Sequence, residues 1–132
     1  MSIRKLRTKR DNQQWMLDLA LNMRGRVQNF ERDDLETPTR AHNYRMLPKQ
    51  WRLKAEHDES LGCQAQAEGF DATACEHYDH AIEAYRMAQH PIFYDDNPVK
   101  LELYDCLNKV VDLRSEIAPY PVERVEVPFD DG

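Results

Sequence analysis

The sequence predicts a mainly α-helical protein: antiparallel helical hairpins or a bundle of 4–5 helices, followed by one C-terminal β-strand of a truncated α/β domain. Three observations predict this class. Apolar residues recur every three or four positions over most of the chain, as on the buried face of a helix. Proline and glycine stand where helices would start and stop. The apolar period changes to two only near the C-terminus, which is typical of a strand.

The N-terminal region is expected to combine a basic, flexible start with a first helix. Residues 1–10 are rich in lysine and arginine, and we expect a solvated terminus rather than a targeting or nucleic-acid-binding arm. The helix is expected to begin near Asp11, a good cap residue, and to end near Gly25. Its core face would consist of Trp15, Leu19 and Met23.

A second helix is expected between Pro48 and Gly69, after an irregular stretch at 29–47. Proline is favoured in the first turn of a helix, and glycine is favoured just beyond the last. Asp58 falls on the apolar side, where we expect it to be paired with a nearby Arg or to lie at the edge of the stripe. The other members of that side are Trp51, Ala55, Gly62 and Ala65.

The third helix carries the clearest pattern, with small and aromatic residues at spacings of four and three. Asp71 is its expected cap, and His90-Pro91 its expected end, because the residue before proline avoids helical angles. Small residues would let a partner helix approach closely, while the rings fill the space between. The stripe consists of Ala74, Tyr78, Ala81, Tyr85 and Ala88.

A fourth helix is expected to restart at Asn97-Pro98 and to finish before Pro119 and Pro121. Its core face would consist of Leu103, Leu107, Val110 and Ile117, widened by Tyr104, Val111 and Ala118.

The C-terminal segment predicts a strand followed by a turn. Apolar residues alternate with polar ones at Val125, Val127 and Phe129, and Asp131-Gly132 is a hairpin-turn signal. A single strand cannot pair its own backbone groups, so we expect its partner in sequence beyond this chain. The expected organisation is therefore a basic N-terminus at 1–10, a helical domain at 11–121, and the first strand and turn of an α/β domain at 122–132.

Composition narrows the classes of function. The chain has 132 residues, a net charge of −6 and 32% charged residues, so nucleic acid is a poor partner. No apolar run approaches the roughly 20 residues that span a bilayer, and no secretory signal is present. Three widely spaced cysteines are more typical of reduced thiols than of a disulfide framework. We therefore expect a soluble, cytoplasmic protein that does not bind a membrane.

No motif in the chain predicts a complete active site or a cofactor. The four glycines are too scattered for a phosphate-binding loop, and no serine lies in a nucleophile motif. His77, His80 and Glu83 are three apart on the third helix, which would suit a metal, but they spread around the helix. We expect a solvated polar face there and not a metal site. Because the other motifs are also missing, we expect no cofactor and no catalytic residue in this chain.

An alternative is a stand-alone, tetratricopeptide-like interaction module formed by the second and third helices. Much of that repeat's spacing is present, at Leu61-Gly62, Gly69, Ala74, Tyr78 and Ala81. The aromatic residue expected before Leu61-Gly62 is Asp58 instead, and no second copy occurs 34 residues away. The spacing indicates close packing of two helices, and such a module would bind a protein partner or a second copy as a homodimer.

Four stretches together resemble a known family: Ala72–Tyr78, Ala84–Ala88, Phe93–Asp96 and Pro121–Phe129. From residue 51 onward the chain resembles the N-terminal helical region of α/β-hydrolase-fold enzymes related to 2,6-dihydroxypseudooxynicotine hydrolase and to fermentation/respiration switch esterase-like proteins. In that family a segment like the last stretch is the first strand of the hydrolase sheet.

The resemblance implies a helical cap over the active site of a serine hydrolase, also called a lid. The nucleophile, the acid and the histidine would all lie in the missing C-terminal hydrolase domain, so this truncated chain alone is expected to be inactive. Its partners would be that domain and, through it, a small-molecule substrate. Tyr85, Phe93 and Tyr94 are candidates to line the substrate entrance, and ordinary core positions are the alternative for each.

Overall fold

The computed structural model describes residue 41 and residues 44–129, and this part is mainly helical, as predicted. The expected helix at 11–25 and most of the stretch at 29–47 lie outside the described residues. The described elements are a short 3₁₀-helix, η1 (Tyr44–Met46), and the helices α3 (Leu47–Ala67), α4 (Asp71–Gln89) and α5 (Pro98–Glu116).

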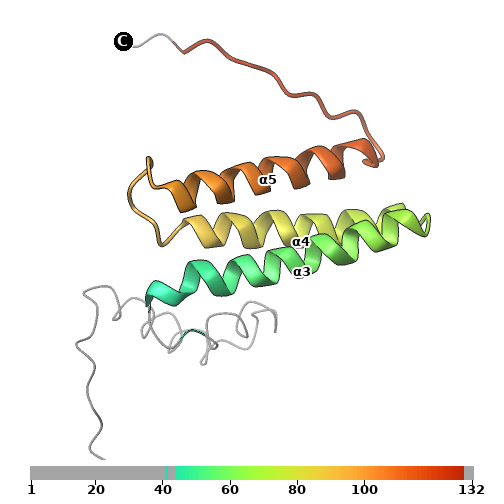
Figure 1. Cartoon of the computed structure of the whole chain (residues 1–132). Helices are drawn as coiled ribbons and strands as arrows, with labels where there is room; N and C mark the ends of the chain where they lie inside the picture. The colour runs from blue at the N-terminus through green and yellow to red at the C-terminus, as the bar shows by residue number, and fades with distance from the viewer. Residues whose placement is uncertain (1–40, 42–43, 130–132) are drawn as a thin grey trace, which may run out of the picture.

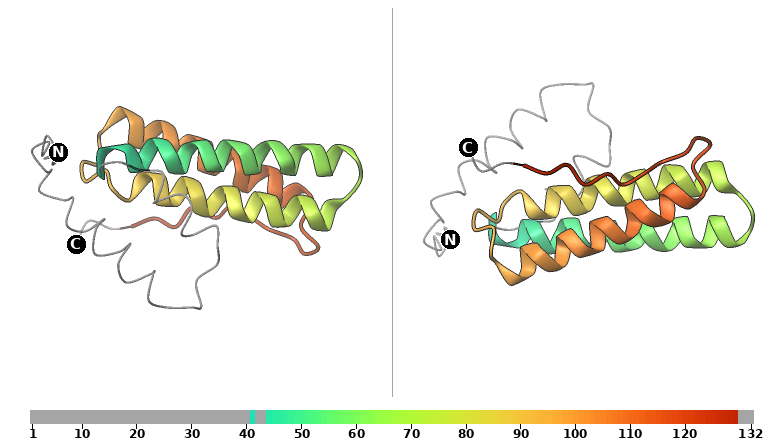
Figure 2. Two further views of the ribbon diagram at one scale, coloured as in Figure 1. Left: turned by 90° about the horizontal axis from the view of Figure 1, so that it is seen from below. Right: turned by 90° about the horizontal axis from the view of Figure 1, so that it is seen from above.

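The three long helices run up, down and up. α3 and α4 form an antiparallel hairpin, and α5 lies over it (Figure 1), running obliquely across the pair in the views from above and below (Figure 2). α4 packs extensively against both of the other helices, so it is the centre of the fold. This arrangement agrees with the expected hairpins.

Gly69 ends α3 through its backbone conformation. Its φ is +83°, a left-handed value that residues other than glycine rarely adopt. The Gly69 N–H donates to Gln66 O at 3.0 Å, and the Phe70 N–H donates to Ala65 O at 2.9 Å. These two bonds form a Schellman motif, which satisfies the last carbonyls of α3 and turns the chain directly into α4. The predicted stop at Gly69 is therefore confirmed, as is a start at Pro48 to within a residue.

The caps of the next two helices differ from each other. The predicted cap of α4 at Asp71 is wrong: Phe70 holds the cap position without a side-chain bond, and Asp71 lies within the first turn. A carboxylate in the first turn still interacts favourably with the helix dipole. The predicted cap of α5 is confirmed, because Asn97 Oδ1 accepts from the N–H of Val99 at 2.9 Å and of Lys100 at 3.4 Å, with Pro98 next in the chain.

The core is built mainly from small and aromatic side chains. α4 buries the whole predicted stripe and also Ala84, and α3 buries the predicted side including Asp58. α5 fully buries only Leu103 and Val110, while Tyr104, expected to widen that face, is exposed. The remaining helix surfaces are rich in charge, and no helix within the described residues is long and apolar enough to cross a membrane.

The predicted strand at 122–129 is not formed within the described residues. Residues 121–129, called the tail below, are extended but have no secondary structure, and every one of them is exposed. The tail leaves the end of α5 and runs away from the hairpin (Figure 1). An extended segment becomes a strand only when a partner pairs its backbone groups, and no described residue does so.

The close approach of α3 and α4 at Gly62 gives a first prediction. A Cβ added at Gly62 would lie 2.6 Å from ring atoms Cδ1 and Cε1 of Tyr78, which is itself fully buried. Overpacking of this kind costs about 1–3 kcal/mol, against the roughly 1 kcal/mol that alanine gains over glycine in a helix. Because the added Cβ would come within 2.6 Å of two ring atoms, the cost should be about 2–3 kcal/mol. We therefore expect Gly62→Ala to lower the free energy of unfolding by about 1–2 kcal/mol in urea denaturation.

Ser60→Ala is the matched control, because it creates the same residue at an exposed position of the same helix. It should change the free energy of unfolding by less than about 0.5 kcal/mol. A Gly62→Ala variant as stable as Ser60→Ala would show that the two helices are not in this contact.

Candidate functional site

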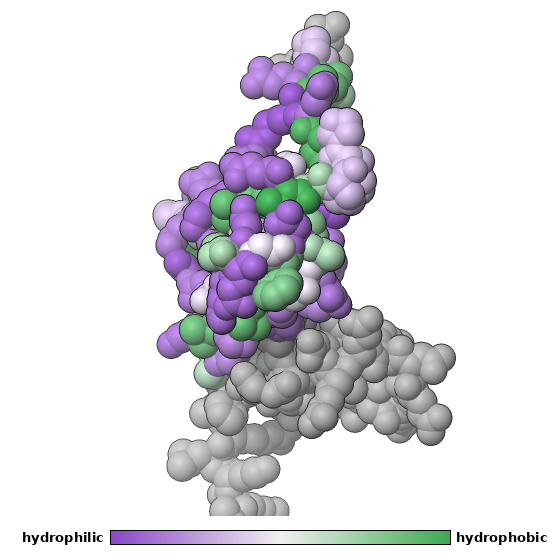
Figure 3. Space-filling view, turned by 90° about the vertical axis from the view of Figure 1, so that its right-hand side faces the viewer, coloured by the Kyte–Doolittle hydropathy of each residue, from purple (hydrophilic) through white to green (hydrophobic). Residues whose placement is uncertain are grey.

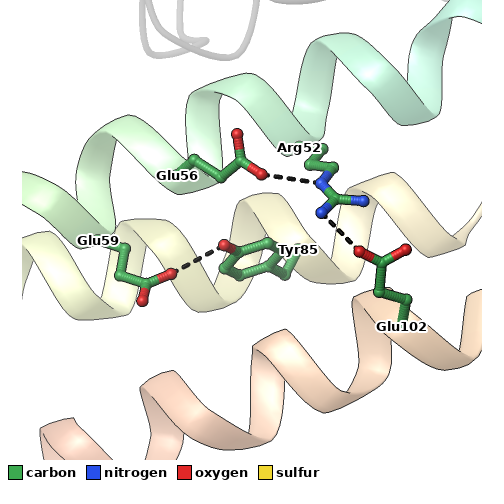
Figure 4. A network of polar contacts seen from close by, with 5 residues as sticks. All are labelled: Arg52, Glu56, Glu59, Tyr85 and Glu102. Atoms are coloured by element: carbon green, nitrogen blue, oxygen red, sulfur yellow. Dashed lines mark hydrogen bonds and ion pairs between the residues drawn. The ribbon is translucent and has the colours of Figure 1, made fainter. Parts of the chain in front are cut away.

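A network of polar side chains joins the three helices (Figure 4). The hydroxyl of Tyr85 in α4 donates to Glu59 Oε2 in α3 at 2.8 Å, and Lys109 Nζ in α5 donates to Glu59 Oε1 at 2.6 Å. One carboxylate thus receives a bond from each of the other two helices. Nearby, Arg52 of α3 binds Glu56 at 2.8 Å and Glu102 of α5 at 2.7 Å.

Burial and hydrogen bonding shift the pKa values of Tyr85, Arg52 and Glu102 so that each stays in the protonation state that pairs with its neighbours. Burial and the bond to Glu59 raise the pKa of Tyr85 well above its ordinary value, so the phenol stays protonated. The carboxylates of Glu102 and Glu56 raise the pKa of Arg52, and that guanidinium lowers the pKa of Glu102. These are structural ion pairs and hydrogen bonds, and they move the pKa values of Tyr85, Arg52 and Glu102 further from neutral pH.

An open groove lies where α4 ends and α5 begins. Its volume is about 500 Å³, and we call it the connector groove. Its charged groups are already paired: Arg86 binds Glu83, and Lys100 Nζ lies 2.5 Å from Asp95 Oδ1. The surface left for a ligand is therefore largely aromatic and aliphatic. The lining consists of Arg86, Gln89, His90, Ile92, Phe93, Lys100, Tyr104 and Leu107.

The three entrance candidates occupy different environments. Phe93 lines the connector groove and is exposed. Tyr94 is 77% exposed and is not part of the lining. Tyr85 is only 1% exposed and bonded to Glu59, so it belongs to the helix interface. The role of all three at a substrate entrance stays a prediction.

Ser115, Cys75 and Cys63 are not arranged as activated nucleophiles. Ser115 Oγ donates to the carbonyl of Val111 in its own helix, and Cys75 Sγ lies 3.8 Å from the carbonyl of Ile117. Cys63 lies beside the hydroxyl of Tyr78, at 3.5 Å. A serine or cysteine nucleophile needs an adjacent base, and the partners here are neutral acceptors or a phenol.

The histidines of α4 are more organised than their spacing suggested. Glu83 turns to Arg86 and does not join them. Instead, His77 and His80 face Asp58 of α3, with one potential ligand atom from each residue within 4.8 Å of the others. Asp58 is buried and accepts a bond from Lys54 Nζ at 2.8 Å, so its partner is a lysine and not the expected arginine. The sequence placed Asp58 on the inner side of its helix but gave no signal that it would meet these histidines.

Comparison with known proteins adds no identification. No protein-family model, curated protein or solved structure matches this chain.

Removal of the Tyr85 hydroxyl tests the inter-helix network. Tyr85→Phe keeps the ring in the core but deprives Glu59 of one donor, while Lys109 stays in place. A hydrogen bond to a charged group contributes about 1.5–3 kcal/mol, and the remaining partner reduces the expected loss to about 1–2 kcal/mol. Tyr104→Phe, at an exposed tyrosine, should leave the free energy of unfolding unchanged. Equal stability of the two variants in urea denaturation would contradict the bond.

The buried phenols also predict a loss of stability at alkaline pH. Burial raises the pKa of both Tyr78 and Tyr85 above the ordinary value. In the unfolded chain tyrosine ionises near pH 10. The contribution of these two phenols to the free energy of unfolding is therefore fully present below that pH and declines as the pH rises above it. Absorbance at 295 nm should show exposed tyrosines titrating first and these two only as the chain unfolds. With Tyr85→Phe the decline of the free energy of unfolding should be less steep. An unaltered slope would refute this account.

Proposed function

We propose that this chain is the helical cap of an α/β-hydrolase-fold serine hydrolase, and that its tail supplies the first strand of the sheet domain. The observation that carries the proposal is the state of the tail. Val125, Val127 and Phe129 are 72%, 80% and 89% exposed, although their alternation is that of a strand with one buried face. Figure 3 shows hydrophobic residues among hydrophilic ones along the segment that projects from the bundle.

The physical cost of that arrangement supports a missing partner. Large apolar side chains at alternate positions lose the free energy of burial, roughly 1.5–3 kcal/mol each, as long as they face water. The tail contacts α5 through an ion pair of Arg124 with Asp112 at 2.9 Å. Just before the tail, the Arg114 guanidinium lies 5.5 Å from the ring centre of Tyr120. These contacts hold the chain where it leaves α5 and do not involve the apolar residues of the tail.

Within this proposal the helices bind part of the substrate and shape its entrance, and the sheet domain carries out the reaction. The connector groove, with Phe93 and its paired charges, suits an apolar or aromatic part of a small substrate. The nucleophilic serine, its histidine and its acid would come from the sheet domain. The substrate and the bond cleaved are not specified by this part.

A stand-alone interaction module is the second candidate, and one observation favours it. The α3–α4 hairpin packs Gly62 against the ring of Tyr78, and both residues match positions in the tetratricopeptide spacing. In that case the partner would be a protein or a second copy of the chain.

The size of the polypeptide in the source cells separates the two candidates. Under the cap proposal, an antibody raised against residues 98–116 detects a polypeptide much larger than 15.6 kDa. A fluorophosphonate probe, which labels activated serines, should mark that same band and should leave the purified 132-residue chain unlabelled. A band at 15.6 kDa alone, without labelling, would overturn the cap proposal and favour the module.

A further inference from the structure

Three potential metal ligands meet between the first two helices of the described part. His77 and His80 are three residues apart, so they share a face of α4, and Asp58 comes from the facing side of α3. One ligand atom from each residue lies within 4.8 Å of the other two. We call these three residues the Asp–His cluster. Its residues are 19 or more positions apart between the two helices, so only the tertiary packing brings them together.

Two members of the cluster are unusual among the described residues. Asp58 is the one charged side chain that is buried, and His77 Nδ1 is the one buried side-chain nitrogen or oxygen without a hydrogen-bond partner there. A buried polar atom without a partner costs about 1–3 kcal/mol. A carboxyl group buried inside the helix pair, next to an imidazole with an unused nitrogen, is a reason to expect a further ligand at this position.

We propose that the Asp–His cluster binds a divalent transition-metal ion of the Zn²⁺ type. Two imidazole nitrogens and one carboxylate oxygen form a known three-residue zinc ligand set, which leaves a fourth position for water or another ligand. Calcium and magnesium require mainly oxygen ligands, and the cluster offers one carboxylate. Imidazole suits zinc, copper, nickel and iron, so the ion belongs to this group.

The geometry needs only small side-chain movements. Ligand atoms about 2.0–2.2 Å from a tetrahedral ion lie roughly 3.4 Å from one another, against separations of up to 4.8 Å here. His80 is exposed, so its ring can rotate toward Asp58 without disturbing the core. Asp58 has two carboxylate oxygens, and Lys54 occupies Oδ2, which leaves Oδ1 for the ion. Lys54 would then orient the ligating carboxylate, as outer partners of metal ligands commonly do.

The bound ion would link α3 to α4 near the middle of the hairpin. Because the three ligands are brought together only by folding, binding would stabilise the folded chain over the unfolded one. The inference is independent of the hydrolase proposal, since it rests on the hairpin alone and does not involve the tail or the connector groove.

The test is a titration of the full 132-residue chain, prepared without a histidine tag and freed of metal by a chelator. Isothermal calorimetry with ZnCl₂ should show one saturable site per chain. Co²⁺ should give the visible absorption of a four-coordinate site. His80→Ala removes an exposed ligand, so the fold is retained while the affinity falls by more than the roughly 10–100-fold effect typical of an outer partner. Asp58→Asn keeps the side-chain volume and should weaken binding as well.

His90→Ala is the matched control, because His90 is exposed, lies at the end of the same helix and is outside the cluster. It should bind Zn²⁺ as tightly as the unaltered chain. Zn²⁺ should also raise the thermal unfolding midpoint of the unaltered chain and of His90→Ala, but not of His80→Ala. Absence of a saturable site, or equal affinity in His80→Ala and His90→Ala, would overturn the proposal and leave the cluster as a polar surface.

Discussion

The contact between Gly62 and the ring of Tyr78 sets the distance between α3 and α4. The missing side chain at Gly62 makes room for the ring, and the alanines of α4 allow the same closeness along the rest of the helix. Both the inter-helix bond of Tyr85 to Glu59 and the meeting of Asp58 with the histidines depend on this separation, because both reach from α4 to α3. Larger residues along this interface would move every one of these groups apart.

The same interface explains why polar groups are tolerated so near the core. Small apolar residues bury little area each, so the helix pair gains less from burial than a leucine-rich pair would. Directed bonds add to the association: Glu59 joins three helices, and Arg52 joins two. Exposed ion pairs such as Arg52–Glu102 contribute little to stability on their own, whereas the bond of Tyr85 to Glu59 is partly buried and contributes more.

The sequence allowed α3, α4 and α5 to be predicted well because their signals are local. The stripe of α4, the Asn97-Pro98 start of α5 and the Gly69 stop each depend on neighbours within a few residues. The Asp71 cap was wrong because the Schellman turn already fixes the backbone at Phe70. Tyr104 was expected inside, but α5 buries a narrow stripe and leaves that ring at the edge of the connector groove.

Features that need a partner could not be predicted in the same way. The alternation of apolar and polar residues at 122–129 is typical of a strand, but it does not identify the strand's pairing partner. No such partner is present among the described residues. The Asp–His cluster was missed because Asp58 and the histidines are far apart in the sequence, and their spacing on separate helices gives no information about rotation around each axis. Where a helix begins and ends depends on residues close in sequence. Which side of one helix faces another depends on how the two helices pack.

The tight turn at Gly69 also bears on the order in which the chain acquires its structure. α3 packs on α4 and α4 on α5, so most contacts join segments that are neighbours in sequence. Folds with such local contacts form quickly, since little chain entropy is lost before the first contacts are made. During synthesis the hairpin would close once α4 has emerged, well before the tail is complete. The tail would thus meet any partner as an extended arm on a scaffold that is already folded.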